Sequence, residues 1–272
     1  MLIFAQMKTT LIISTYNASV TLNRCLESIT RQTVMPDEVV IADDGSGEAT
    51  KEVIRYWKDR LPCVVKHVWQ ENKGFRKTIV MNMGFAVCTG DYIIQIDGDI
   101  IMERHFIQDH KRYARPGQFI CGSRSRIKQS YSRKLKRGKN VKLSFIRPGL
   151  DDRMNALRFS PLVRFFRNYD HLRGCNMSFW REDILAINGY DETITAYGYE
   201  DEDVQERLQR IGKKKLFIKF MCIEYHLWHV EHPTKKNLAE TRKLIDHNNE
   251  INLIRSPKGI DSHLGEDNLV KY

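Results

Sequence analysis

The sequence predicts an α/β domain built on a doubly wound, mostly parallel β-sheet. Short apolar runs alternate with amphipathic segments over the first hundred residues, in the order β-α-β-α-β-α-β. Polar residues follow each apolar run, at the strand ends where sheets of this kind bind ligands. A chain of 272 residues with 42% hydrophobic and 29% charged side chains can bury a sizeable core, which excludes wholesale disorder.

Each element of this first part is predicted by its own pattern. Strands are expected where apolar, β-rich runs end in polar residues, at 9–15, 38–46, 63–70 and 91–100. Helices are expected where apolar residues recur at helical spacing, at 20–32, 48–60 and 78–88. In the first of these helices, Leu22, Cys25, Leu26 and Ile29 share one face, and Pro36 follows its end.

The second half of the chain is less regular. Residues 122–168 have no clean periodicity and many basic and aromatic side chains, so we interpret them as a basic insertion. Beyond it we expect a helical segment at 181–189, an acidic turn at 195–203, a helix at 204–212 and one long strand at 215–229. The polar tail beyond Thr234 is predicted to be helical up to about Ile254 and irregular after it.

Several features favour a cytoplasmic location. No apolar run approaches the roughly 20 residues that a membrane-spanning helix needs. The first residues, MLIFAQMKTTLIIS, show neither the basic region nor the small-residue cleavage site of a signal peptide. Six cysteines are scattered without a CxxC pair, which indicates reduced thiols and argues against a structural zinc or a redox motif.

Polar segments follow the predicted strands and are expected to meet in one crevice: Ser14–Asn17, Asp43–Ser46, Asn72–Arg76 and Asp97–Asp99. The phosphate-binding patterns GxGxxG and GxxxxGKS/T are absent, which argues against a dinucleotide oxidoreductase or a P-loop enzyme. Because the crevice is acidic, a phosphate ligand would need a divalent cation between itself and the protein. Asp97 and Asp99 offer oxygen ligands suited to Mg²⁺ or Mn²⁺, although solvated turn carboxylates would show the same spacing.

Together, ISTYN, DDGS, NKGFR and GDYIIQIDGD resemble the nucleotide-binding half of family-2 glycosyltransferases, which are inverting enzymes with the GT-A fold. This resemblance covers Thr9 to about Met102. A second stretch, RGCNMSFWREDILAINGYDE and then GYEDEDVQERL, resembles the acceptor-side motif of many of these enzymes and of the β-galactosyltransferases. The resemblance implies one GT-A catalytic domain over 1–234, with a nucleotide-sugar-binding half at 1–102, the basic insertion at 122–168, an acceptor half at 169–234 and a C-terminal helical or irregular tail at 235–272.

The resemblance also implies roles for residues on the donor side. Tyr16 and Ser14 would line the nucleobase pocket. Asp44, or its neighbour Asp43, would accept hydrogen bonds from the uracil and the ribose. Arg76 would approach the base or the phosphates.

The same resemblance makes Asp97 and Asp99 the DxD element that binds the donor and a divalent metal, Mn²⁺ or Mg²⁺. Asp99 would touch the metal directly. The sequence departs from the family at residues 77–80, before Asn82, where an Ala-Arg-Asn triplet is common. The match at Arg76 is therefore less close than the match at the aspartates.

On the acceptor side, Asp201 in GYEDED aligns with the general base of the family and Glu200 with its acidic neighbour. Acids at a helix N-terminus are also favoured by the helix dipole, so we expect Asp203 to serve the helix and Asp201 to serve the chemistry. Glycosyl transfer from a nucleoside diphosphate needs a cation at the leaving pyrophosphate and a carboxylate that takes the acceptor's proton. The sequence supplies acids for both purposes on separate segments.

Histidines close to the end of the last predicted strand are further candidates for the metal. Their position resembles that of the third metal ligand of these enzymes, near the C-terminal end. His229 is preferred slightly over His226, and His232 is a weaker candidate. A purely structural role is the alternative, because neither an HExxH motif nor a Cys/His finger is present.

The positive charge of the chain is concentrated in one segment. The whole chain has 44 basic and 34 acidic residues, a net charge of +10, yet residues 104–147 contain fourteen Lys or Arg and a single acid, Asp109. Basic and apolar residues within 124–166 would suit an anionic membrane surface, and a solvated loop that shapes the acceptor cleft is an equal alternative. A nucleic-acid partner is not expected, because the acidic crevice would repel a polyanion.

These observations predict a cytoplasmic, metal-dependent, inverting glycosyltransferase that uses a UDP-sugar donor. Its acceptor would be a glycan or lipid-linked hydroxyl in the synthesis of surface polysaccharide or lipopolysaccharide. The alternative from another class is an inactive GT-A scaffold that binds membranes or nucleic acid through its basic segment. A nucleotidyltransferase is disfavoured, because ISTYNAS is not a glycine-rich phosphate loop.

Overall fold

The protein is described by a computed structural model that covers residues 7–166, 174–195, 198–230 and 238–272. The strands are β1 Thr9–Thr15, β2 Glu38–Asp43, β3 Val64–Trp69, β4 Tyr92–Asp97, β5 Ile100–Met102, β6 Gln118–Cys121, β7 Ser123–Arg126, β8 Asn176–Trp180, β9 Lys214–Phe217 and β10 Ile223–His226. The α-helices are α1 Ser19–Ile29, α2 Glu48–Lys58, α3 Lys77–Val87, α4 Phe106–Tyr113, α5 Gln129–Lys136, α6 Val163–Phe166, α7 Arg181–Ala186, α8 Glu200–Arg210 and α9 Leu238–Glu250. Short 3₁₀ turns occupy Arg153–Ala156, Ser160–Leu162 and Ile260–His263.

The central sheet confirms the predicted α/β class. Its strands in the described residues follow the order β3-β2-β1-β4-β8-β6-β9. β1 runs parallel to β2 and β4, β2 runs parallel to β3, and β8 is antiparallel to both of its neighbours. The register sets Ser14 opposite Asp97 and Thr15 opposite Asp43, so the polar ends of β1, β2 and β4 lie side by side.

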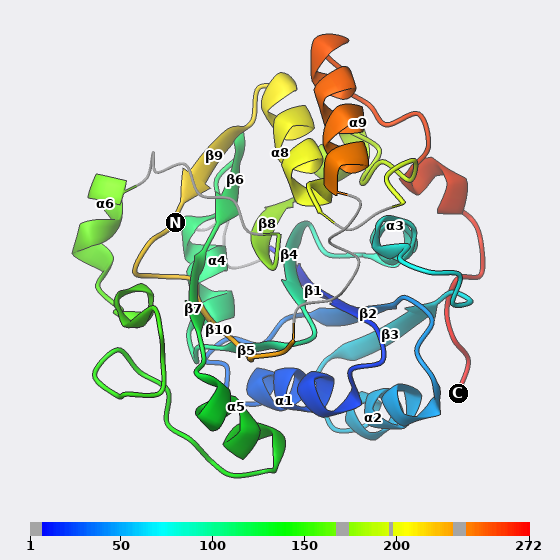
Figure 1. The fold of residues 1–272 in the computed structure, drawn as a ribbon. Coiled ribbons are helices and arrows are strands. Elements are labelled where there is room, and N and C mark those ends of the chain that lie inside the picture. The colour runs from blue at the N-terminus through cyan, green and yellow to red at the C-terminus, as the bar shows by residue number, and fades with distance from the viewer. Residues whose placement is uncertain (1–6, 167–173, 196–197, 231–237) are drawn as a thin grey trace.

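Helices cover both faces of this sheet, as Figure 1 shows with α1 and α2 on one side and α3, α8 and α9 on the other. Successive residues of a strand point to opposite faces. Leu11 and Ile13 of β1 therefore pack in the core with Leu26 of α1, whereas Ile12 packs in the second core with Phe85 of α3. These two cores fix the strands whose ends form the site.

The second half of the chain differs from the sequence prediction in two places. The long strand expected at 215–229 is wrong, because the run is divided between β9 in the central sheet and β10 in a small sheet of order β5-β10-β7. Phe220 and Cys222 have φ angles of +71° and +49°, and this left-handed backbone cannot continue a strand. The acidic turn expected before residue 204 is instead the first turn of α8, which begins at Glu200.

The C-terminal tail packs against the domain. Residues of α9 form the predicted helix, and Ile260 of the following 3₁₀ turn is fully buried in the same core as α3. At the far end, the ring of Tyr272 stacks on His67 of β3 with a centroid distance of 5.7 Å. Within the described ranges, no helix is both long and apolar enough to cross a membrane. All six cysteines are free thiols.

Candidate active site

The ends of β1 and β4 are joined directly. Ser14 Oγ donates a hydrogen bond of 2.6 Å to Asp97 Oδ1. The same carboxylate oxygen lies 3.1 Å from Nζ of Lys77, the first residue of α3. Burial opposes ionisation of Asp97, but the Lys77 ammonium and the Ser14 hydroxyl outweigh it and lower the pKa of this carboxyl.

The two aspartates at the end of β2 are both buried, and each has its own partners. Asp43 accepts the backbone N–H of Ser46 at 2.8 Å and contacts Nε2 of His67 at 3.2 Å. Asp44 accepts the side-chain amide of Gln70 at 2.5 Å and the backbone N–H of Arg76 at 2.9 Å, and its burial raises its pKa. Asp44, unlike Asp43, therefore also binds the loop that precedes α3.

Tyr16 and Arg76 lie at the same end of the sheet. Tyr16 is 42% exposed, and its hydroxyl accepts a hydrogen bond from the Asn72 amide at 2.9 Å. Arg76 is the N-cap residue of α3, and one guanidinium N–H donates to the carbonyl of Glu71. The Arg76 side chain is therefore folded back on its own loop, with Nε unpartnered among the described residues.

Three side chains from two segments form a candidate metal centre. Nε2 of His226 and Nε2 of His229 lie 3.3 Å and 3.1 Å from Oδ2 of Asp99. One ligand atom from each residue falls within 4.8 Å of the others. His226 ends β10, which pairs antiparallel with β5 immediately after Asp99, so the small sheet brings the histidines to the DxD element. Both histidines predicted as ligands lie in this cluster, and His232 lies outside the described residues.

The chemistry of this cluster fits a divalent cation. Asp99 Oδ1 is buried without a hydrogen-bond partner in the described part of the chain, which leaves an oxygen available for an ion. Burial lowers the pKa of His226, and the hydrogen bond to Asp99 raises that of His229. Two imidazole nitrogens and one carboxylate form a donor set typical of first-row divalent metals. Asp97, predicted as a second ligand, is not in the cluster, because it faces Ser14 and Lys77.

The second acidic pair lies at the start of α8. Asp201 Oδ1 accepts the hydroxyl of Tyr190 at 2.6 Å and the amide of Gln95 at 3.4 Å. A Cβ atom on Gly174 would lie 1.6 Å from Asp201 Oδ2, so only glycine leaves room for this carboxylate. Asp201 is thus held by β4 and by the segment that follows α7.

Glu200 is almost fully buried beside Asp201. Its Oε2 accepts the backbone N–H of Gly198 at 2.8 Å, and its Oε1 lies 3.9 Å from Nζ of Lys77. Burial and the neighbouring Asp201 raise the pKa of Glu200 to about 7, and Lys77 acts in the opposite direction. Burial disfavours the charged form of Lys77, but Asp97, Asp201 and Glu200 together raise its pKa well above its usual value.

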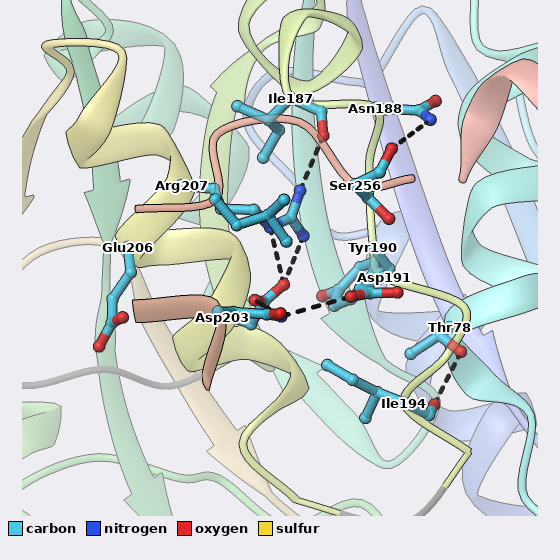
Figure 2. A network of polar contacts seen from close by, with 12 residues as sticks. Thr78, Ile187, Asn188, Tyr190, Asp191, Ile194, Asp203, Glu206, Arg207 and Ser256 are labelled. Carbon is cyan, nitrogen blue, oxygen red and sulfur yellow. Dashed lines mark hydrogen bonds and ion pairs between the residues drawn. The ribbon is translucent and has the colours of Figure 1, made fainter. Parts of the chain in front are cut away.

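Asp203, the next acid but one, belongs to the scaffold. Figure 2 shows Arg207 directed at Asp203 and at the carbonyl of Ile187. Two guanidinium nitrogens contact Asp203 Oδ2 at 2.8 Å and 2.6 Å, and a third donates to Ile187 at 2.7 Å. Asn248 of α9 donates to Asp203 Oδ1 at 3.1 Å. Because this ion pair is fully buried, it fixes the first turn of α8 and with it the acids before it.

Sequence reasoning missed the residues that connect the two acidic pairs. Lys77 appeared only as part of the departure from the family pattern, although its position at the start of α3 directs it to the strand ends. Gln95 lies inside β4, and its amide donates to the Tyr190 hydroxyl at 2.7 Å. Tyr190 and Gln95 lie 11 and 106 positions from Asp201, so no local pattern links them.

Comparison with known proteins is consistent with this geometry. The model of glycosyl transferase family 2 matches residues 10–182, and the model described as the N-terminal domain of galactosyltransferase matches residues 156–233. Validoxylamine A glucosyltransferase of Streptomyces hygroscopicus subsp. limoneus is 26% identical over 243 residues, which are 83% of this chain and 51% of that protein. Chondroitin synthase of Escherichia coli is 25% identical over 268 residues, which are 90% of this chain and 38% of that protein. The chain thus spans about half of the length of the first of these relatives and less than half of the second.

Solved structures share the fold. A Pyrobaculum calidifontis mannosyltransferase in complex with GDP-Man and Mn²⁺ superposes with a TM-score of 0.61 at 20% identity, over 93% of this chain and 66% of that one. S. aureus TarS in complex with UDP-GlcNAc gives a TM-score of 0.61 at 12% identity, over 94% of this chain and 69% of that one. With a family model that matches well over half of its residues, the chain belongs to glycosyl transferase family 2 and has the GT-A fold.

Proposed function

We propose that this protein is an inverting, metal-dependent glycosyltransferase that moves a sugar from a UDP-sugar to a hydroxyl of a glycan or lipid-linked acceptor. The single observation that supports this most is the position of Lys77. Its ammonium contacts Asp97 on the donor side and Glu200 on the acceptor side, at 3.1 Å and 3.9 Å. Two acidic groups of different segments therefore face one small space, as transfer between two substrates requires.

The donor would bind at the ends of β1, β2 and β4. We assign Tyr16 and Ser14 to the nucleobase side, and Asp44 or Asp43 to the uracil and ribose, with Arg76 near the base or phosphates. Asp99, His226 and His229 would hold a divalent cation, and Asp97, which Ser14 and Lys77 contact, would bind the donor. A bound Mn²⁺ or Mg²⁺ supplies a Lewis acid that stabilises charge on the leaving pyrophosphate.

The acceptor would bind near the start of α8. We assign Asp201 as the general base, because Tyr190 and Gln95 fix its carboxylate and Gly174 leaves room beside it. Glu200 would orient the acceptor hydroxyl or share its proton, and a pKa of about 7 suits that exchange. Attack by this hydroxyl on the side of the sugar opposite the leaving group inverts the anomeric centre.

We further propose a cytoplasmic location, with peripheral contact between the basic insertion and the inner face of the membrane. The product would belong to surface polysaccharide or lipopolysaccharide. Residues 1–234 would form the catalytic unit, and the tail 235–272 would close one side of it through Ile260 and Tyr272.

A screen of nucleotide sugars, with and without Mn²⁺, tests this function. A ligand that binds only the native state raises its melting temperature, so a UDP-sugar with Mn²⁺ should produce the largest shift. The preferred donor should then release UDP in the presence of an acceptor, and NMR of the product should show an inverted anomeric configuration. Absence of any nucleotide-dependent shift and of UDP release would instead favour an inactive scaffold.

A further inference from the structure

The basic insertion contains a pocket that the proposed transfer reaction does not use. It has a volume of about 490 Å³ and is open to solvent. One wall is α5, and the other is the segment 139–148, which we call the strap. Four of the residues that line this strap pocket are basic, Lys134, Lys139, Lys142 and Arg147, and the aromatic Tyr131 lines it with them.

One end of the strap is fixed by the C-terminus of α5. The N–H of Lys139 donates to the carbonyl of Lys134 at 3.0 Å, and the N–H of Gly138 donates to Leu135 at 2.9 Å. Gly138 has φ of +81°, and this pair of bonds with a left-handed glycine is a Schellman cap. The cap reverses the chain and sets the backbone of Lys139 next to that of Lys134, and both residues line the pocket.

The other end of the strap is tied back to the start of α5. The N–H of Lys128 donates to the carbonyl of Gly149 at 3.0 Å, and Ile127 forms a β-bridge with Leu150. Tyr131 packs flat on the backbone here, because a Cβ atom on Gly149 would come within 2.7 Å of its ring. The pocket wall is therefore built by backbone hydrogen bonds at both ends.

The cations of the strap pocket form no ion pair within the described part of the chain. No carboxylate of these residues pairs with Lys134, Lys139, Lys142 or Arg147. Lys134 Nζ lies 4.9 Å from the centroid of the Tyr131 ring. Clustered cations of this kind attract an anionic ligand.

Apolar side chains lie directly beside these cations. The N–H of Arg147 donates to the carbonyl of Ser144 at 3.1 Å, which closes a turn with Phe145 and Ile146 at its corner. Their side chains are 39% and 71% exposed. Large apolar residues held at a turn beside a basic pocket suit a ligand with an anionic head and an apolar body.

The pocket is also connected to the candidate metal centre. On the face of α5 that points away from the strap, Ser132 Oγ accepts the N–H of Trp228 at 2.8 Å, and Lys136 Nζ donates to the carbonyl of Trp228 at 2.9 Å. Trp228 lies between His226 and His229 in the chain. A ligand in the strap pocket would thus be one helix away from the site of transfer.

We propose that the strap pocket binds the phosphate group of a membrane lipid, with Phe145 and Ile146 entering the apolar boundary of the bilayer. The cations supply the charge that a phosphate needs, and the turn supplies the apolar contact. If the bound lipid also carries the acceptor, that acceptor is lipid-linked. This second statement rests on the proposed function, whereas binding of the lipid is tested independently of transfer.

Vesicle binding tests the proposal without any transfer reaction. The variant K139Q/K142Q/R147Q removes three pocket charges, and K128Q/R133Q/R137Q removes three exposed charges of the same insertion that do not line the pocket. The pocket variant should bind vesicles of phosphatidylglycerol and phosphatidylcholine about a hundredfold more weakly, at roughly 1 kcal/mol for each charge. The matched variant should lose less, because its three charges do not line the pocket that would hold the phosphate. Equal losses in the two variants, or no loss in either, would show that the strap pocket does not bind the lipid phosphate.

A third variant tests the apolar contact. F145S/I146S should weaken vesicle binding at least tenfold, because each side chain buried in the bilayer contributes on the order of 1 kcal/mol or more. It should still bind dihexanoyl phosphatidic acid, measured as monomer with no divalent metal present, as well as the wild type does. Unchanged vesicle binding by F145S/I146S would overturn the apolar contact. Binding of inorganic phosphate by a wild-type protein that does not bind the vesicles would overturn the lipid and identify a free phosphate instead.

Discussion

Lys77 Nζ lies 3.1 Å from Asp97 Oδ1, and the same ammonium lies 3.9 Å from Glu200 Oε1. Asp97 ends β4 in the first half of the chain, and Glu200 begins α8 in the second half. A single cation therefore holds together two carboxyl groups that would otherwise repel each other. This relationship has consequences for catalysis and for its pH dependence.

Replacing Lys77 by Met should lower the transfer rate and move its pH dependence. Because Lys77 lowers the pKa of both Asp97 and Glu200, its removal should raise these pKa values. The acidic limb of the pH–rate profile should then move to higher pH by about one to three units. The matched control is Lys73→Met, since Lys73 pairs with Glu71 at the surface of the same loop. A profile that stays in place in Lys77→Met would show that this ammonium does not set the ionisation of the two carboxyls.

Asp99→Ala should abolish Mn²⁺-dependent UDP binding and leave the fold intact. Asp99 is the only carboxylate among the three residues of the described metal cluster. Its side chain contacts the two histidines of that cluster. The measurement is the rise in melting temperature with UDP plus Mn²⁺ relative to UDP alone. Asp151→Ala, an exposed aspartate of the insertion, should behave as the wild type. Retained metal-dependent binding in Asp99→Ala would remove the ion from this position.

Asp201→Asn should slow transfer by about a hundredfold to ten-thousandfold, because asparagine keeps the shape but cannot take a proton. Donor affinity should stay nearly the same, since the donor residues lie on other segments. Glu200→Gln should slow transfer less. Turnover and donor affinity are measured side by side in both variants. A larger loss in Glu200→Gln than in Asp201→Asn would transfer the role of base to Glu200, whose pKa lies near 7.

Glu200→Gln should also stabilise the protein above neutral pH. The pKa of Glu200 is about 7 in the folded protein and near 4.5 in an unfolded chain. Because the pKa of this carboxyl is raised in the folded state, its contribution to the free energy of unfolding is most favourable below pH 4.5. That contribution declines as the pH rises to about 7. The gain in Glu200→Gln should grow across this window to about 3 kcal/mol. Urea unfolding at pH 4, 6 and 8 measures it; a gain independent of pH would contradict the raised pKa.

Arg207→Ala should destabilise the fold by about 3–5 kcal/mol, because it leaves Asp203 charged and buried without its partner. Asp203→Asn combined with Arg207→Met should recover much of this loss, since neither residue is then an uncompensated ion. The control is Arg242→Ala, which breaks partly exposed ion pairs with Glu202 and Asp246 and should cost about 1 kcal/mol. Denaturant unfolding compares all three. A loss in Arg207→Ala as small as in the control would mean that the buried pair does not hold α8.

The sequence alone was sufficient to predict the strands and helices of the first hundred residues and the class of chemistry. Strand and helix patterns up to Asp97 depend on neighbours within a few residues, and the structure reproduces their order with shifts of one to three residues at most ends. Ser14, Asp43 and Asp97 could be placed together because parallel strands end at one edge of a sheet. The family was evident for the same reason, since its motifs lie at those ends.

Only the tertiary structure decided what each of these residues contacts. The apolar run 215–229 reads as one strand, but left-handed backbone at Phe220 and Cys222 sends its second part into another sheet, beside Asp99. That step is what brings His226 to Asp99, more than a hundred positions earlier in the chain. The contact of Lys77 with Asp97 and Glu200 likewise depends on how two halves of the chain pack, and no periodicity records it. Local patterns specify elements, whereas a site is made by side chains that meet across the fold.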